Sequence, residues 1–220
     1  MRELVALLLG FGQGCADASA RFEAFGDRRT AIGNEGGAPD TGFAGAAGAD
    51  GADAPCMPPA PGVVHGPALL ALETTTSPEV PILFLGEVET PDLDGKTAVK
   101  YSYMALDASD RKTQVGDPLV VGPYPIQEDG SFDAPTAEST LPGSANAILP
   151  GVPITSRLTL HGTICGIASF YCGTVTGSVS SPVQGPTSGQ FGLTLLESED
   201  ELPERPRYGC SEDALGPALE

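Results

Sequence analysis

Glycine and proline, the residues that most often interrupt helices, supply 29 and 21 of the 220 residues, together almost a quarter of the chain. An average protein contains about 12% of the two combined. Glycine destabilises a helix interior and proline breaks it, so long helices are not expected here. The sequence instead favours short extended segments separated by turns.

Several segments after residue 64 alternate apolar and polar residues, which is typical of strands with one buried face. Turn-forming pairs such as Asp94-Gly95 and Asp129-Gly130 separate them. Roughly seven or eight short strands of this kind predict an all-β fold, either an antiparallel β-sandwich or an open barrel. We expect this domain to span residues 64–210, with a C-terminal tail at 211–220. The clearest strand candidates are 80–88, 99–105, 157–164, 174–180 and 190–195.

The first residues have the layout of a secretory signal: Arg2, then an apolar run at 4–11, then small residues. The run is too short to span a bilayer. Residues 12–15, Gly-Gln-Gly-Cys, resemble the lipobox of bacterial lipoproteins, although Gly12 stands where that motif usually has leucine. The resemblance implies a signal peptide at 1–14 and a lipid on Cys15, which becomes the new N-terminus. Simple secretion, after cleavage near residues 16–20, is the alternative.

The segment that follows has the composition of a tether. Residues 15–63 are rich in Gly, Ala, Asp and Pro, most of all between 36 and 55. Such a segment buries too little apolar surface to offset the entropy of ordering it. The sequence therefore predicts a flexible linker between Cys15 and the β domain.

Two short stretches resemble a known family. Residues 126–134, followed by Thr-Leu-Pro-Gly at 140–143, are similar to a hairpin of prealbumin-like and carboxypeptidase-regulatory-like domains. This resemblance implies a small β-sandwich serving as a spacer, a carbohydrate-associated module or an adhesion unit. The whole chain, with eight arginines but three lysines, also resembles lipoproteins of unknown function from high-GC myxobacteria. That implies a surface location without implying an activity.

The formal charge of −18, from 29 acidic and 11 basic residues, argues against nucleic acid as a partner. Phosphate binding requires clustered Lys and Arg side chains.

Four cysteines remain once Cys15 is assigned to lipid: Cys56, Cys165, Cys172 and Cys210. An even number in an exported chain predicts two disulfides, for which three pairings exist. We expect Cys165–Cys172, because these residues flank a turn between adjacent strands, and therefore Cys56–Cys210. A metal site is not expected, because the sequence has no Cys-x2-Cys pair.

Motifs for catalysis are sparse, so the leading hypothesis is a non-enzymatic envelope lipoprotein without a cofactor. Its β domain would serve a structural or binding role toward an unknown envelope protein or glycan, with the membrane as a second partner through the lipid. The expected location is the cell envelope, as an outer-membrane or periplasmic surface protein, or alternatively the secreted fraction.

Two alternatives stay open. An exported hydrolase would use His161 with acidic neighbours, for which Asp107, Asp129 and Asp133 are the candidates. Outside that hypothesis, both histidines, His65 and His161, are expected to be solvated surface residues. A carbohydrate-binding module would stack sugars on tyrosines, and the candidates for this role are Tyr101, Tyr103 and Tyr124. Against it, Tyr101 and Tyr103 share a strand face that is expected to point inward.

Overall fold

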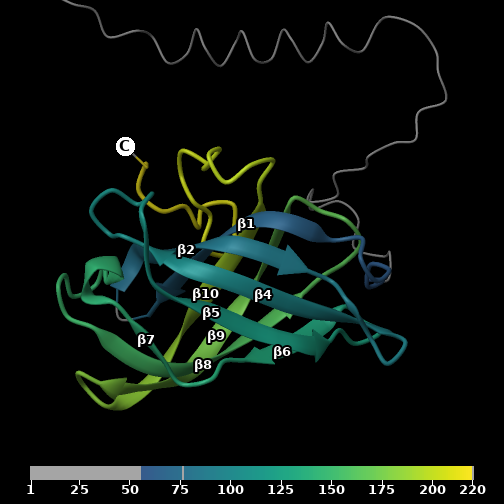
Figure 1. The fold of residues 1–220 in the computed structure, drawn as a ribbon, viewed down its shortest axis with the longest axis horizontal. Helices are drawn as coiled ribbons and strands as arrows, with labels where there is room; N and C mark the ends of the chain where they lie inside the picture. The colour runs from purple at the N-terminus through teal and green to yellow at the C-terminus, as the bar shows by residue number, and fades with distance from the viewer. Residues whose placement is uncertain (1–55, 76, 220) are drawn as a thin grey trace, which may run out of the picture. The chain divides into compact units, whose positions relative to one another are not determined.

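Antiparallel strands are the main secondary structure in the chain that the computed structural model describes, which comprises residues 56–75 and 77–219 (Figure 1). The expected signal peptide at 1–14, the lipidated Cys15 and most of the expected linker lie outside these residues. The strands are β1 (His65–Thr74), β2 (Ser77–Glu89), β3 (Asp92–Leu93), β4 (Lys96–Leu106), β5 (Gln114–Pro125), β6 (Ser131–Pro135), β7 (Ser139–Leu141), β8 (Ile154–Thr163), β9 (Phe170–Ser181) and β10 (Gly185–Leu195). The helix in this part is a single 3₁₀ turn, η1 (Gly143–Ala145).

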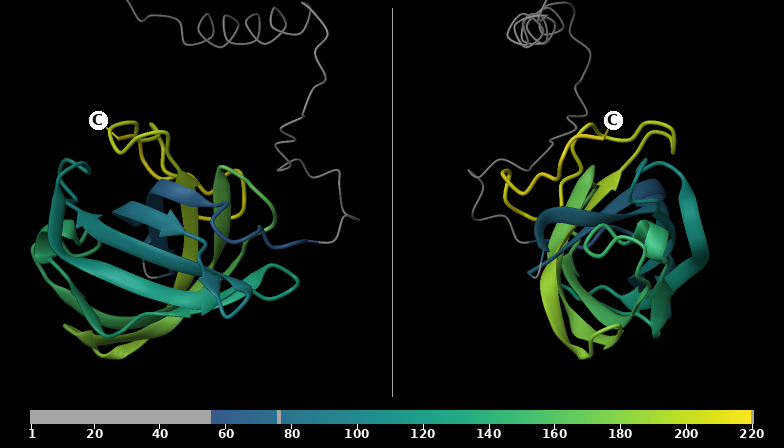
Figure 2. Two further views of the ribbon diagram at one scale, coloured as in Figure 1. Left: turned by 45° about the vertical axis from the view of Figure 1, so that its right-hand side comes forward. Right: turned by 90° about the vertical axis from the view of Figure 1, so that its left-hand side faces the viewer.

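The expected all-β fold is confirmed, and of its two forms the chain adopts the open barrel. Strands pair in the order β3-β4-β2-β1-β10-β9-β8-β6, with β5 beside β4 and β7 beside β8. The sheet curls until β5 comes into contact with β6. No ladder joins these two among the described strands, so the sheet is a half-barrel (Figure 2). The Tyr124 hydroxyl of β5 spans this seam and donates a hydrogen bond to the Pro135 carbonyl of β6 at 2.9 Å.

Turn chemistry sets where the strands reverse. Asp94 and Gly95 both have positive φ, 54° and 80°, between β3 and β4. This combination favours a tight hairpin and suits an Asp-Gly pair. Gly130 begins the return into β6 with φ 78°, and an added Cβ there would lie 2.2 Å from the Cys56 sulfur. Glycine is therefore required at this position both for backbone conformation and for space.

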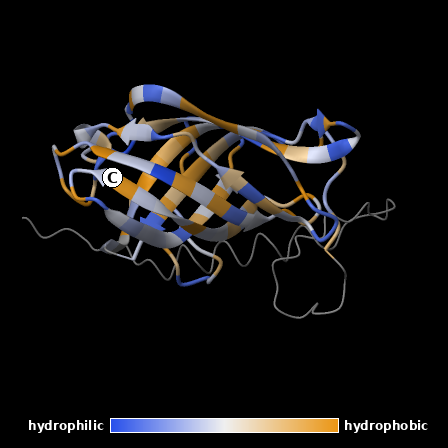
Figure 3. Cartoon of the chain, turned by 90° about the horizontal axis from the view of Figure 1, so that it is seen from below, coloured by the Kyte–Doolittle hydropathy of each residue, from blue (hydrophilic) through white to orange (hydrophobic). Residues whose placement is uncertain are grey.

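The alternation along the strands, visible in Figure 3, places one set of side chains inside the half-barrel. This inner core includes Leu70, Tyr101, Phe132 and Phe191, each at most 4% exposed. Burial of such a continuous apolar surface is the main stabilising contribution to the fold.

A second apolar cluster lies on the outer face of β1 and β2. Leu69 and Leu85 belong to it, together with Tyr208 and Ala214 from residues 196–219, which we term the C-terminal cover. The Arg207 guanidinium lies 4.2 Å above the centre of the Phe170 ring, a cation–π contact that joins the cover to β9. Because both its faces are covered, β1 is buried at every position from Ala68 to Glu73.

Candidate functional site

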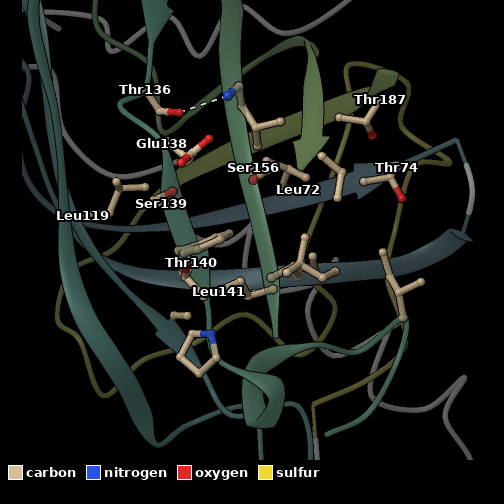
Figure 4. A pocket seen from close by; sticks show the side chains of 18 of the residues that line it. Leu72, Thr74, Leu119, Thr136, Glu138, Ser139, Thr140, Leu141, Ser156 and Thr187 are labelled. Carbon is tan, nitrogen blue, oxygen red and sulfur yellow. Dashed lines mark hydrogen bonds between the residues drawn. The ribbon is translucent and has the colours of Figure 1, made fainter. Parts of the chain in front are cut away.

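A pocket of about 770 Å³ opens into the half-barrel (Figure 4). The inner faces of β1, β2, β4, β5 and β8 form its walls, and the β9–β10 turn and the segment from 136 to 142 lie at its rim. Its volume falls within the range of about 300–1,000 Å³ that is typical of small-molecule sites.

The pocket runs from solvent into the apolar core. Val183 and Leu149 line it and are 74% and 46% exposed, whereas Val121 and Leu160 also line it and are 2% and 3% exposed. Exposed aliphatic side chains that line one opening together are a feature of ligand-binding grooves. The arrangement suits an elongated apolar molecule whose inner end is removed from water.

The polar side chains of the pocket are mostly hydroxyls, with one amide and two carboxylates: Thr74, Asp117, Thr136, Glu138, Ser139, Thr140, Ser156, Gln184 and Thr187. The Thr136 hydroxyl accepts a hydrogen bond from the Leu158 amide at 3.0 Å, which fixes the segment between β6 and β7 against β8 (Figure 4). Asp117 and Glu138 contribute carboxylates, and no lysine, arginine or histidine is found among the described lining residues. The pocket therefore has no cationic side chain to neutralise an anionic ligand.

Two tyrosines lie at the inner part of this region. Tyr103 lines the pocket and is 2% exposed, while Tyr101, 1% exposed, stacks on it with ring centroids 5.4 Å apart. Burial raises the pKa of the Tyr103 phenol well above its ordinary value, and the proximity of Tyr101 adds to this shift. Both face inward as expected, so they do not form an exposed sugar-stacking surface. Tyr124, the third candidate, donates its hydroxyl hydrogen bond to the Pro135 carbonyl of β6.

The expected disulfide pairing is wrong, although the expectation of two disulfides is confirmed. The bonds are Cys56–Cys165 and Cys172–Cys210. Cys172 follows the inward-facing Tyr171 along β9, so its side chain points outward to the C-terminal cover. Cys165 lies beyond the end of β8, where the Gly166 amide donates a hydrogen bond to the Met57 carbonyl at 2.9 Å. Both disulfides indicate an oxidising compartment outside the cytoplasm.

His161 makes a hydrogen-bonded chain on the outer face of the sheet. Its Nδ1 lies 2.6 Å from Asp133 Oδ1 and its Nε2 lies 2.8 Å from Thr176 Oγ1. The structure thus brings His161 to one of its three acidic candidates. Asp107 and Asp129 instead accept hydrogen bonds from Ser109 and Ser131.

The order of carboxylate, imidazole and hydroxyl in this chain is the one that activates a nucleophile in many hydrolases. Those enzymes also use free backbone amides to stabilise the developing oxyanion. Here the three residues lie on the neighbouring strands β6, β8 and β9, and none of the three lines the described pocket. The chain of hydrogen bonds therefore fixes side chains across three strands.

The remaining histidine, His65, lies at the start of β1, where its Nδ1 hydrogen-bonds to the Gly62 carbonyl at 3.0 Å. In the part of the chain that the structure describes, no group of three or more His, Cys, Asp or Glu side chains is placed to hold a metal ion. That part also contains no helix of the length and apolar character needed to cross a bilayer. Comparison of this chain with protein-family models, curated proteins and solved structures finds no match in any of the three.

Proposed function

We propose that the domain is a non-catalytic binding protein that holds a small apolar molecule in the pocket of the half-barrel. The observation that supports this is the largely apolar lining, which includes both the exposed Val183 and the buried Leu160. Burying an apolar ligand surface there gains about 25 cal/mol for each Å² removed from water. Antiparallel barrels of about eight strands can hold one small ligand in their interior.

The first test measures whether a hydrocarbon binds in this pocket. Diphenylhexatriene, a fluorophore without polar groups, should brighten saturably on titration with the wild-type protein. Ser156 lines the pocket, so its replacement by tryptophan should fill the space and weaken binding by about tenfold or more, equivalent to at least about 1.4 kcal/mol.

The matched control is Ser178→Trp. Ser178 is exposed on the neighbouring strand β9 and does not line the pocket, so this variant should bind like the wild type. His161→Ala should also bind normally, and a hydrolytic activity that this variant abolishes would favour the enzyme hypothesis instead. Absence of saturable binding, or equal affinity of the two tryptophan variants, would contradict the proposed pocket function.

We further propose that this binding domain is tethered to the cell envelope through a lipid on Cys15. Support comes from the lipobox-like residues 12–15 and from the two disulfides, which indicate an oxidising compartment. A single lipidated terminus holds a domain at a membrane surface without a spanning helix. A pocket for apolar molecules would then lie close to the membrane, which is a source of such ligands.

Cells fed a radiolabelled fatty acid should incorporate label into the wild-type protein and not into Cys15→Ser. The variant should move from the membrane fraction to the soluble exported fraction, because the anchor is gone. Cys15→Ser leaves all four disulfide cysteines unchanged, so unaltered disulfides serve as the folding control. An unlabelled wild-type protein would contradict the anchor while leaving the pocket proposal intact.

A further inference from the structure

The hydroxyl groups of the two stacked tyrosines have no hydrogen-bond partner among the described residues. Tyr101 and Tyr103 are 1% and 2% exposed, and neither hydroxyl has a hydrogen-bond partner in the described structure. Most buried polar side-chain atoms in native proteins are hydrogen-bonded, and an unpaired one reduces stability. A phenylalanine at either position would keep the apolar ring and avoid this cost, so the hydroxyls require an explanation.

The two positions differ in their relation to the pocket. Tyr103 lines it together with Phe84, whose ring centroid lies 6.4 Å from that of Tyr103. Tyr101 comes earlier in β4 than Tyr103, lies beside Phe132 in the inner core, and does not line the pocket. Of the two tyrosines, therefore, Tyr103 alone contributes to the wall of the pocket.

The charges at the pocket restrict the chemistry of that molecule. Asp117 and Glu138 line it, no described lining residue is cationic, and the formal charge of the chain is −18. A carboxylate or phosphate inside this pocket would lose its hydration without gaining an ion pair, which is strongly unfavourable. An uncharged oxygen, by contrast, needs only one hydrogen bond to compensate for its burial.

We propose that the pocket is selective for uncharged, elongated lipid-like molecules with an oxygen at the inner end, which accepts a hydrogen bond from the Tyr103 hydroxyl. This inference rests on the proposed pocket function and specifies its ligand class, that of long-chain alcohols, ketones and esters. The Tyr103 hydroxyl is itself buried although the residue lines the pocket, so binding of the oxygen requires lining side chains to move aside.

The test compares three proteins that differ by single oxygen atoms: the wild type, Tyr103→Phe and Tyr101→Phe. Each is loaded with diphenylhexatriene, and 1-decanol or decanoate is added as competitor. Tyr103→Phe should bind 1-decanol about fivefold to tenfold more weakly, the usual effect of losing one neutral hydrogen bond. Its affinity for diphenylhexatriene, which has no oxygen, should stay within about twofold of the wild type.

Tyr101→Phe is the matched control and should bind both molecules like the wild type. Decanoate should compete about tenfold less well than 1-decanol on the wild-type protein, because the carboxylate finds no cation. Both tyrosine variants should be at least as stable as the wild type in urea, because each removes an unpaired buried hydroxyl.

The results separate the two proposals. If the wild type binds diphenylhexatriene but Tyr103→Phe binds 1-decanol unchanged, or decanoate competes better than 1-decanol, the proposed ligand class is overturned and the pocket function stands. If the wild type does not bind diphenylhexatriene at all, both are overturned.

Discussion

Replacing Cys56 and Cys165 together by alanine is expected to lower the free energy of unfolding by as much as about 5 kcal/mol. The bond joins residues 109 positions apart, so its removal releases a long loop in the unfolded chain. Cys56 also precedes Pro59, whose carbonyl accepts a hydrogen bond from the buried Thr97 hydroxyl at 2.7 Å. Loss of the disulfide therefore also weakens the attachment of residues 56–63 to the sheet.

Urea unfolding followed by circular dichroism measures this change. The double replacement of Cys172 and Cys210 is the matched comparison, because this bond spans 38 positions and the same relation gives a maximum of about 4 kcal/mol. Peptide mapping without reduction checks that the remaining pair forms correctly in each variant. An unchanged unfolding free energy after removal of Cys56 and Cys165 would contradict the expected role of the longer bond.

Leu69→Ala is expected to lower the free energy of unfolding by about 2–5 kcal/mol, the usual range for a buried leucine. Leu69 is 1% exposed although it lies on the outer face of the sheet, because the C-terminal cover packs over it. Truncation leaves a cavity between β1 and Tyr208, and the cover loses apolar contacts that hold it in place.

The control is Val120→Ala in β5, at a side chain that is 56% exposed, for which a change of less than about 0.5 kcal/mol is expected. Limited proteolysis adds a local readout, since a loosened cover should be cleaved within residues 196–219 sooner in Leu69→Ala than in the control. Equal stability of the two variants would show that the cover contributes little to the fold.

Most of the strands that the sequence predicted alternate apolar and polar residues, and the exception is the apolar run at 80–88, which lies within β2. Segments 99–105 and 190–195 lie within β4 and β10, and 157–164 lies in β8 except for Ile164, which follows the strand. Strand β1 was not predicted, because its apolar and polar residues do not alternate. The C-terminal cover packs on its outer face, so apolar residues occupy both of its faces. Strand β5 was also missed, since Gly116 and Pro118 interrupt it.

The candidate site was accessible to sequence reasoning only in part. The pairing of His161 with Asp133 follows from cross-strand register between β8 and β6, and Asp133 was among the acidic candidates. The pocket was not predicted, because its lining comes from many strands and turns that are distant along the chain. A weak signal was present: Ala105 and Ser156 are small residues at inward positions where a filled barrel would need large ones.

The sequence by itself indicated that the chain forms antiparallel strands and that four of its cysteines form two disulfides, because Gly/Pro frequency, alternation and cysteine number are local or additive properties. The tertiary structure decided which cysteines meet, that the sheet curls into a half-barrel, and that a pocket remains above Tyr103. These features depend on which face each strand turns inward and on how far the sheet closes. Both are set by packing among residues that are distant in the sequence, such as Cys172 with Cys210 and β1 with the C-terminal cover.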